Sequence, residues 1–175
     1  LHTAQKTANA RWIGIAPFAK HRGKIYPIDK MEQVVATLSA LPNTTLFLFG
    51  AGASERAIIE RWCRQYDHTY AAGGDQQIAH ELALMAHLDV MLTMDSANMH
   101  MASLVGTRVV SVWGATHPYA GFLGYGQREA DCIQRNMPCR PCSVYGNKPC
   151  QYGDYRCLTT ITPNAIVCKL LEERA

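Results

Sequence analysis

Residues 91–118 read MLTMDSANMHMASLVGTRVVSVWGATHP, and this stretch decides the fold expected for the chain. The run 90–94 is short and apolar and ends at an acidic residue, as a buried strand does. Apolar residues then recur at helical spacing over 98–105, before Gly106 supplies a C-terminal stop. A second apolar, β-branched run follows over 108–113. The stretch therefore predicts a β-α-β unit.

Asp95 and Ser96 lie where the first strand of this unit passes into its helix. Ligands of α/β sheets bind outside the carboxyl ends of the strands, and the N–H groups at a helix N-terminus suit a phosphate. The N–H groups of residues 96–98 are therefore phosphate candidates, and the Asp95 carboxylate is a candidate acceptor for sugar hydroxyls. From this pattern alone, it is equally open that Asp95 and Ser96 only cap the helix.

The rest of the chain extends the same alternation. Strands are predicted over 11–17, 45–49 and 68–72, with helices between them and a last helix over 163–173. Strands that alternate with helices predict an α/β fold built on a Rossmann-like, doubly wound parallel sheet. One domain is expected over 11–175, after a linker or a cut start over 1–10.

Composition excludes several other classes. An apolar content of 48% and a charged content of 18% in 175 residues are those of an ordinary globular protein. No apolar run approaches the roughly 18 residues of a membrane span, and the polar start lacks a secretory signal pattern. The net charge of +3 is too small to indicate nucleic acid binding. A basic cluster over 20–24 matters more.

The segment Asp95-Ser96-Ala97-Asn98-Met99-His100, followed by Gly106, an apolar strand and Trp-Gly-Ala-Thr-His-Pro, resembles the hallmark region of glycosyltransferase family 9. That family includes the ADP-heptose:lipopolysaccharide heptosyltransferases. Its pattern is Asp-Ser/Thr-Gly-x-x-His, then a strand ending near Phe-Gly-x-Thr-x-Pro. This chain has Ala97 where the family usually has glycine and Asn98 where proline is frequent, and the alanine methyl leaves less room beside the donor sugar.

Two further segments carry the resemblance. Lys24-Ile25-Tyr26-Pro27 is similar to the family's Lys-x-Trp-Pro segment, whose lysine reaches the phosphates of the donor. The segment ending at Glu55 resembles a strand-Gly-x-Glu segment, whose glutamate accepts hydrogen bonds from ribose hydroxyls. The alternatives are a solvated surface lysine at Lys24 and a favourable helix-dipole contact at Glu55.

Other site residues rest on weaker signals. The turn 73–78 corresponds to the family's adenine-binding turn, where Gln76 is the expected contact. His100 lies one helical turn beyond Ser96 and could reach a phosphate or the sugar, although a structural role is an equal alternative. Lys20 and Arg22 are candidate helpers of Lys24.

The resemblance covers residues 11 to about 165 and corresponds to the C-terminal, donor-binding half of a two-domain GT-B enzyme. It implies inverting transfer of heptose from ADP-heptose to the lipopolysaccharide inner core, without a metal. The catalytic base and the acceptor site are expected in the N-terminal half, so residues 1–175 alone should be inactive. The resemblance also implies a cytoplasmic protein at the inner face of the inner membrane, with any membrane contact made by the longer protein.

Two other functions stay open. A nucleotide-sugar epimerase of related architecture would need more acidic residues and a histidine around the sugar. A non-catalytic nucleotide-binding module would bind the nucleotide without transferring or hydrolysing the sugar.

Seven cysteines are present, and six of them lie in the last third of the chain. Cys139, Cys142, Cys150 and Cys157 could supply four thiolates to a structural zinc ion, but the spacing is not that of a standard zinc finger. Free thiols or disulfide pairs are the alternatives. Residues 131–160, called the Cys-rich segment here, are expected to lie apart from the donor site.

Overall fold

A single parallel sheet forms the centre of the computed structural model, which describes residues 6–74 and 78–173. Within those residues the strand order is β3-β2-β1-β4-β5-β6. The strands are β1 (Arg11–Ala16), β2 (Thr44–Phe49), β3 (Thr69–Ala72), β4 (Val90–Met94), β5 (Val109–Trp113) and β6 (Cys132–Gln134). The order reverses between β1 and β4, as in other Rossmann-like sheets, and the α/β prediction is confirmed.

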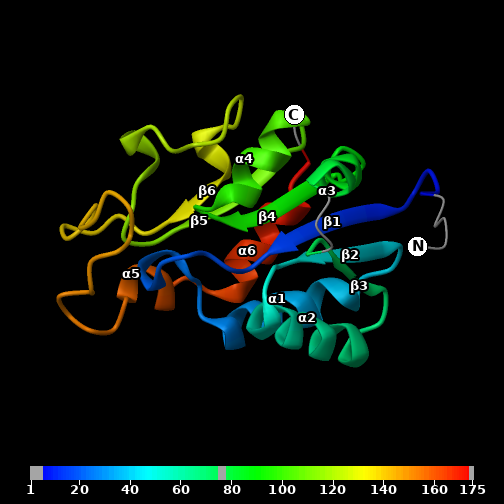
Figure 1. Cartoon of the computed structure of the whole chain (residues 1–175), viewed down its shortest axis with the longest axis horizontal. Helices are drawn as coiled ribbons and strands as arrows, with labels where there is room; N and C mark the ends of the chain where they lie inside the picture. The colour runs from blue at the N-terminus through cyan, green and yellow to red at the C-terminus, as the bar shows by residue number, and fades with distance from the viewer. Residues whose placement is uncertain (1–5, 75–77, 174–175) are drawn as a thin grey trace.

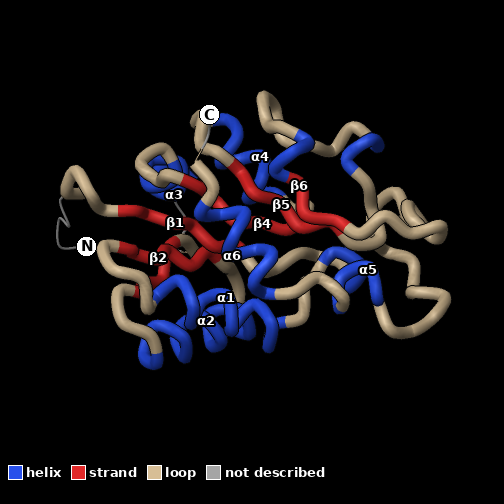
Figure 2. Tube along the Cα trace, turned by 180° about the vertical axis from the view of Figure 1, so that it is seen from behind, coloured by secondary structure: helices blue, strands red, loops and turns tan. Residues whose placement is uncertain are grey.

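Helices cover both faces of this sheet (Figure 1). One face packs against α1 (Ile28–Ser39), α2 (Ala53–Gln65) and α6 (Pro163–Leu171), and α6 lies across the strands in the reverse view of Figure 2. The other face packs against α3 (Ile78–Met85) and α4 (Ala97–Leu104). None of the helices in the described ranges combines the length and the hydrophobicity that a membrane crossing needs.

The two apolar layers follow from the sequence pattern. Ile13 and Ile15 of β1 are fully buried on the α1 side, where the α1 stripe Met31, Val34, Val35 and Leu38 is fully buried as well. Trp113 and Met99 are fully buried on the α4 side. Burying such a side chain stabilises the fold by about 1.5–3 kcal/mol, so both faces of the sheet must be covered.

The carboxyl ends of the strands carry the irregular part of the chain. Between β5 and α6 lie two single-turn 3-10 helices (Pro118–Ala120 and Glu129–Asp131), strand β6 and the short helix α5 (Arg156–Thr159). Figure 1 shows the orange segment that follows β6 beyond the carboxyl ends of the strands, at one end of the sheet. The sequence predicted no strand after β5, because the three residues of β6 are too few to show periodicity.

The edge strand β6 is anchored by an ion pair. Arg108, just before β5, lies 2.6 Å from the carboxylate of Asp131, just before β6. The same guanidinium donates hydrogen bonds to the carbonyls of Lys169 and Glu172 at the end of α6. This arrangement joins the last helix to the sheet edge, at the end away from the irregular loops.

Candidate functional site

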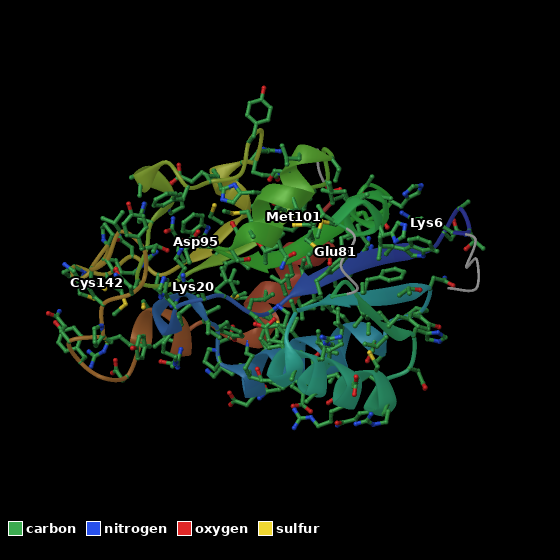
Figure 3. All side chains as sticks on the ribbon, viewed as in Figure 1. Lys6, Lys20, Glu81, Asp95, Met101 and Cys142 are labelled. Atoms are coloured by element: carbon green, nitrogen blue, oxygen red, sulfur yellow. The ribbon has the colours of Figure 1, made fainter. Side chains whose placement is uncertain are left out.

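A cavity of about 640 Å³ opens at the carboxyl ends of β1, β2 and β4, where the strand order reverses. Its volume is within the range of small-molecule sites. The predicted substrate-binding residues that the structure describes all line it: Lys24, Glu55, Asp95, Ser96, Ala97 and His100. Gln76 lies outside the described residues. In Figure 3 Lys20 and Asp95 lie toward this end of the sheet and Lys6 lies at the other.

A buried ion pair lies at the base of the cavity. Lys24 Nζ is 2.8 Å from Asp95 Oδ2, and the side chains of Lys24 and Asp95 are only 15% and 5% exposed. Thr116 Oγ1 donates a hydrogen bond of 2.8 Å to the same carboxylate oxygen. Lys24 is therefore not a solvated surface lysine. Its ammonium has three donors, so two remain for a ligand beyond Asp95.

The structure does not support the helix-cap alternative for the Ser96 side chain. Ser96 occupies the N-cap position of α4, but its side chain makes no capping hydrogen bond. Ser96 Oγ is buried and has no partner within the described part of the chain. Ser96 lines the cavity, so this hydroxyl without a partner lies beside the space that a ligand would occupy. The N–H groups of Ala97 and Asn98 begin the helix and need acceptors from outside it.

Two glutamates, Glu55 and Glu81, line the cavity. Glu55 Oε2 accepts a hydrogen bond of 2.8 Å from the N–H of Ala51, so this carboxylate braces its own turn. Glu81, at the start of α3, accepts a hydrogen bond of 3.0 Å from the N–H of Gly74. Sequence reasoning missed Glu81, whose only signal was an acid in the first turn of a helix.

The basic cluster contributes unequally. Lys20 and His21 line the cavity beside Lys24. Arg22 does not line it, so its expected role as a helper of Lys24 is not supported. The Arg22 guanidinium instead donates to the carbonyl of Ile25 at 2.9 Å and lies 4.5 Å from the centre of the Tyr155 ring. This residue holds the loop to the Cys-rich segment.

Aromatic side chains form part of the cavity wall. Phe122 and Tyr145 line the cavity with their ring centres 5.9 Å apart, and Lys24 Nζ is 5.9 Å from the Phe122 centre. Phe18 also lines the cavity, against Gly50. These three rings were missed from the sequence, because they belong to loops without any periodic pattern.

His100 extends from the second turn of α4 and is exposed at the cavity. A structural histidine would be buried among partners, so the structural alternative is not supported here. Ala97 is also exposed beside it, which leaves its methyl at the mouth of the cavity.

A family model of glycosyltransferase family 9 (heptosyltransferase) matches residues 1–152, which is most of the chain. The chain belongs to glycosyltransferase family 9. The match includes the loop with Lys24, the turn with Glu55 and the start of α4. No curated protein sequence matches the chain significantly.

Solved structures of family 9 glycosyltransferases share the fold. E. coli ADP-heptose lipopolysaccharide heptosyltransferase II superposes with a TM-score of 0.70 at 20% identity, over 94% of this chain and 46% of that one. E. coli heptosyltransferase WaaC with ADP gives 0.68 at 15% identity, over 92% and 43%. The iron-containing dodecameric glycosyltransferase TibC from enterotoxigenic E. coli gives 0.68 at 13% identity, over 96% and 46%. The chain thus spans less than half the length of these family 9 structures.

In this family 9 chain, Cys139, Cys142, Cys150 and Cys157 line one small hollow of about 20 Å³. All four are free thiols, and burial raises the pKa of the Cys157 thiol. Within residues 6–74 and 78–173, no three His, Cys, Asp or Glu side chains are arranged to hold a metal ion. The zinc site stays a prediction.

The expected separation between the Cys-rich segment and the candidate site is wrong. Tyr145 of that segment lines the cavity. The N–H of Cys142 also donates a hydrogen bond of 3.1 Å to the carbonyl of Ala115, one residue before Thr116. The segment has too little periodicity for its path to be predicted, and the fold turns it back over the site.

Proposed function

We propose that this chain is the donor-binding half of an inverting GT-B heptosyltransferase, which moves heptose from ADP-heptose to the lipopolysaccharide inner core. The observation that carries the proposal is the convergence of six predicted binding residues on one cavity at the strand-order reversal. Two related structures support the choice of donor. WaaC is described with ADP, and TibC is described in complex with ADP-D-beta-D-heptose.

Each residue has a role that its contacts allow. The two remaining donors of Lys24 and the first N–H groups of α4 would bind the diphosphate, with Ser96 Oγ as an additional donor. Glu55 would accept from the ribose hydroxyls, and Asp95 would accept from a heptose hydroxyl. His100 would contact a phosphate or the sugar from the exposed side.

The proposed transfer breaks the bond between the anomeric carbon of heptose and the β-phosphate oxygen of ADP. The leaving ADP carries away the electron pair, and Lys24 with the α4 N-terminus stabilises the charge that develops on it. An acceptor hydroxyl forms the new bond and gives its proton to a base from outside this chain. No metal is needed for this sequence of steps, and residues 1–175 alone are proposed to bind donor weakly and to transfer nothing.

The test is a titration of the protein expressed from its complete gene with ADP-heptose, ADP and UDP-sugars. Binding of the two adenine compounds in preference to UDP-sugars, followed by heptose transfer to a lipopolysaccharide core acceptor, would support the proposal. Conversion of the donor sugar without an acceptor would identify an epimerase instead. Binding without any turnover would identify a nucleotide-binding module. Cell fractionation would test the proposed localisation at the cytoplasmic face of the inner membrane.

A further inference from the structure

The loop that follows β5, residues 114–117 and called the β5 loop here, connects the Cys-rich segment to the base of the cavity. On one side, the N–H of Ala115 donates a hydrogen bond of 2.8 Å to the carbonyl of Gly23, next to Lys24. On the other side, the carbonyl of Ala115 accepts hydrogen bonds from the N–H groups of Cys142 and Ser143 at 3.1 and 3.3 Å. The β5 loop is therefore fixed between two segments far apart in sequence.

Arg140 is the side chain that holds this loop from the Cys-rich segment. Its Nη2 donates a hydrogen bond of 2.8 Å to the carbonyl of Thr116 and one of 3.1 Å to Gln134 Oε1. Its Nε and Nη1 donate to the carbonyls of Gly114 and Arg135. All four acceptors are neutral, and burial lowers the pKa of the guanidinium. A partly buried arginine without a carboxylate partner in these contacts acts as a clamp on backbone rather than as half of an ion pair.

Thr116 passes this constraint on to the site. It is fully buried, and its hydroxyl donates to Asp95 Oδ2 at 2.8 Å. Lys24 Nζ contacts the same oxygen at 2.8 Å. Within the described residues no donor reaches Asp95 Oδ1. One carboxylate oxygen is thus held by the protein, and the other stays available to a ligand.

We propose that Thr116 and Arg140 are positioning residues that fix the Asp95 carboxylate so that its free oxygen receives a hydroxyl of the donor sugar. The inference rests on the proposed function and goes beyond it, since it assigns to the Cys-rich segment a role in sugar recognition. Arg140 acts through the carbonyl of Thr116, and Thr116 acts through its hydroxyl. Because Asp95 would contact the sugar, loss of this positioning should weaken the binding of ADP-heptose more than the binding of ADP.

Two variants and a matched control test the role of Thr116 in the protein expressed from its complete gene. Thr116→Val removes the hydroxyl and nearly keeps the shape, whereas Thr116→Ser keeps the hydroxyl. Thr107→Val is the control, because Thr107 is also buried and its hydroxyl donates 2.6 Å to the carbonyl of Met85, away from the cavity. The readout is the ratio of the affinities for ADP-heptose and ADP, with the melting temperature measured in parallel.

Thr116→Val should lower this ratio about tenfold, as expected for a lost hydrogen bond to a charged group, and Thr116→Ser should restore most of it. Thr107→Val should lower the melting temperature and leave the ratio unchanged. An unchanged ratio in Thr116→Val, with a melting temperature like that of the control, would overturn the proposal. Absence of binding of both ADP and ADP-heptose by the unmodified protein would overturn the proposed function and this inference together.

A double-mutant cycle tests Arg140. Arg140→Gln should lower the ratio in the unmodified background and add nothing in the Thr116→Val background, because the two residues act in series. Additive losses would show that Arg140 does not act through Thr116 and would overturn that part of the proposal. If Arg140→Gln does not fold, Arg140→Lys takes its place in the cycle, because lysine keeps the charge but lacks the forked donors of the guanidinium.

Discussion

Lys24 and Asp95 form a buried ion pair of 2.8 Å between the loop after β1 and the carboxyl end of β4. These are the two adjacent strands at which the strand order reverses. Breaking such a pair leaves a buried charge without a partner, which costs more than the pair contributes when intact. The pair therefore couples the stability of the fold to the integrity of the cavity.

Lys24→Ala should weaken donor binding about tenfold or more, because a charge-assisted contact to phosphate contributes roughly 1.5–3 kcal/mol. The free energy of unfolding should also fall, since Asp95 keeps its charge without Lys24. The measurement is the donor KM and kcat of the complete protein, with urea unfolding in parallel. Lys6→Ala is the control, as Lys6 pairs with the exposed Asp89 at the far end of the sheet. An unchanged KM and kcat would leave Lys24 with a structural role only.

Under the proposed function, Asp95→Asn should reduce heptose transfer roughly tenfold to hundredfold, because it removes the charge proposed to accept from a sugar hydroxyl. The amide oxygen can still accept from Thr116 and from Lys24, so the fold should survive, although Lys24 loses its charged partner and the melting temperature should fall as it does in Lys24→Ala. Transfer assays and thermal unfolding distinguish the two effects. Asp89→Asn, an exposed aspartate away from the cavity, is the control. Full activity combined with a large loss of stability would contradict the assignment.

The buried Tyr26 should lower the free energy of unfolding at alkaline pH, where its hydroxyl titrates. Burial, together with the nearby Asp29 charge, raises the pKa of Tyr26 from 10.0 to about 12. The unfolded chain loses this proton near pH 10 while the folded protein keeps it, so the free energy of unfolding is unaffected below that pH. It then falls by about 2–3 kcal/mol between roughly pH 10 and 12.

Urea unfolding at pH 9, 10 and 11 measures this effect against two variants. Tyr26→Phe removes the titrating group and should flatten the slope, although it leaves the carbonyl of Ile161 without the 2.8 Å hydrogen bond from the tyrosine hydroxyl. Tyr125→Phe is the control, because Tyr125 is 87% exposed. Equal slopes in all three proteins would show that Tyr26 does not govern the alkaline loss.

If zinc is bound by Cys139, Cys142, Cys150 and Cys157, elemental analysis of protein purified without chelator should find about one zinc per chain. Cys139→Ser should remove most of it, whereas Cys168→Ser, at an exposed cysteine outside this group, should not. Metal removal should loosen the Cys-rich segment, because metal binding contributes to its folding free energy. Since this segment supplies Tyr145 to the cavity, donor affinity should fall as well. A zinc content well below one per chain would leave free thiols or disulfides.

The sheet and the cavity residues that follow its strands could be predicted from the sequence for a physical reason. Lys24, Glu55 and Asp95 each follow a strand, and parallel strands bring such positions to one edge. Thr116 lies within the quoted motif, but its bond to Asp95 crosses from one strand end to the next and leaves no trace in local spacing. Arg140 and Tyr145 belong to the irregular Cys-rich segment, whose path depends on tertiary contacts alone.

The close approach of three backbone segments at Gly23 has a consequence for folding. A Cβ atom at Gly23 would lie 2.8 Å from the carbonyl oxygen of Gly146 and 2.9 Å from Cβ of Ala115, so this junction accepts only glycine without a shift. The segments that meet there come from near the start and near the end of the chain, and contacts of such high sequence separation form late. During synthesis the sheet strands emerge before the wall of the cavity. A chain truncated before residue 140 would lack both Tyr145, which lines the cavity, and α6, which covers one face of the sheet, so it should lose the wall of the cavity and part of its stability together.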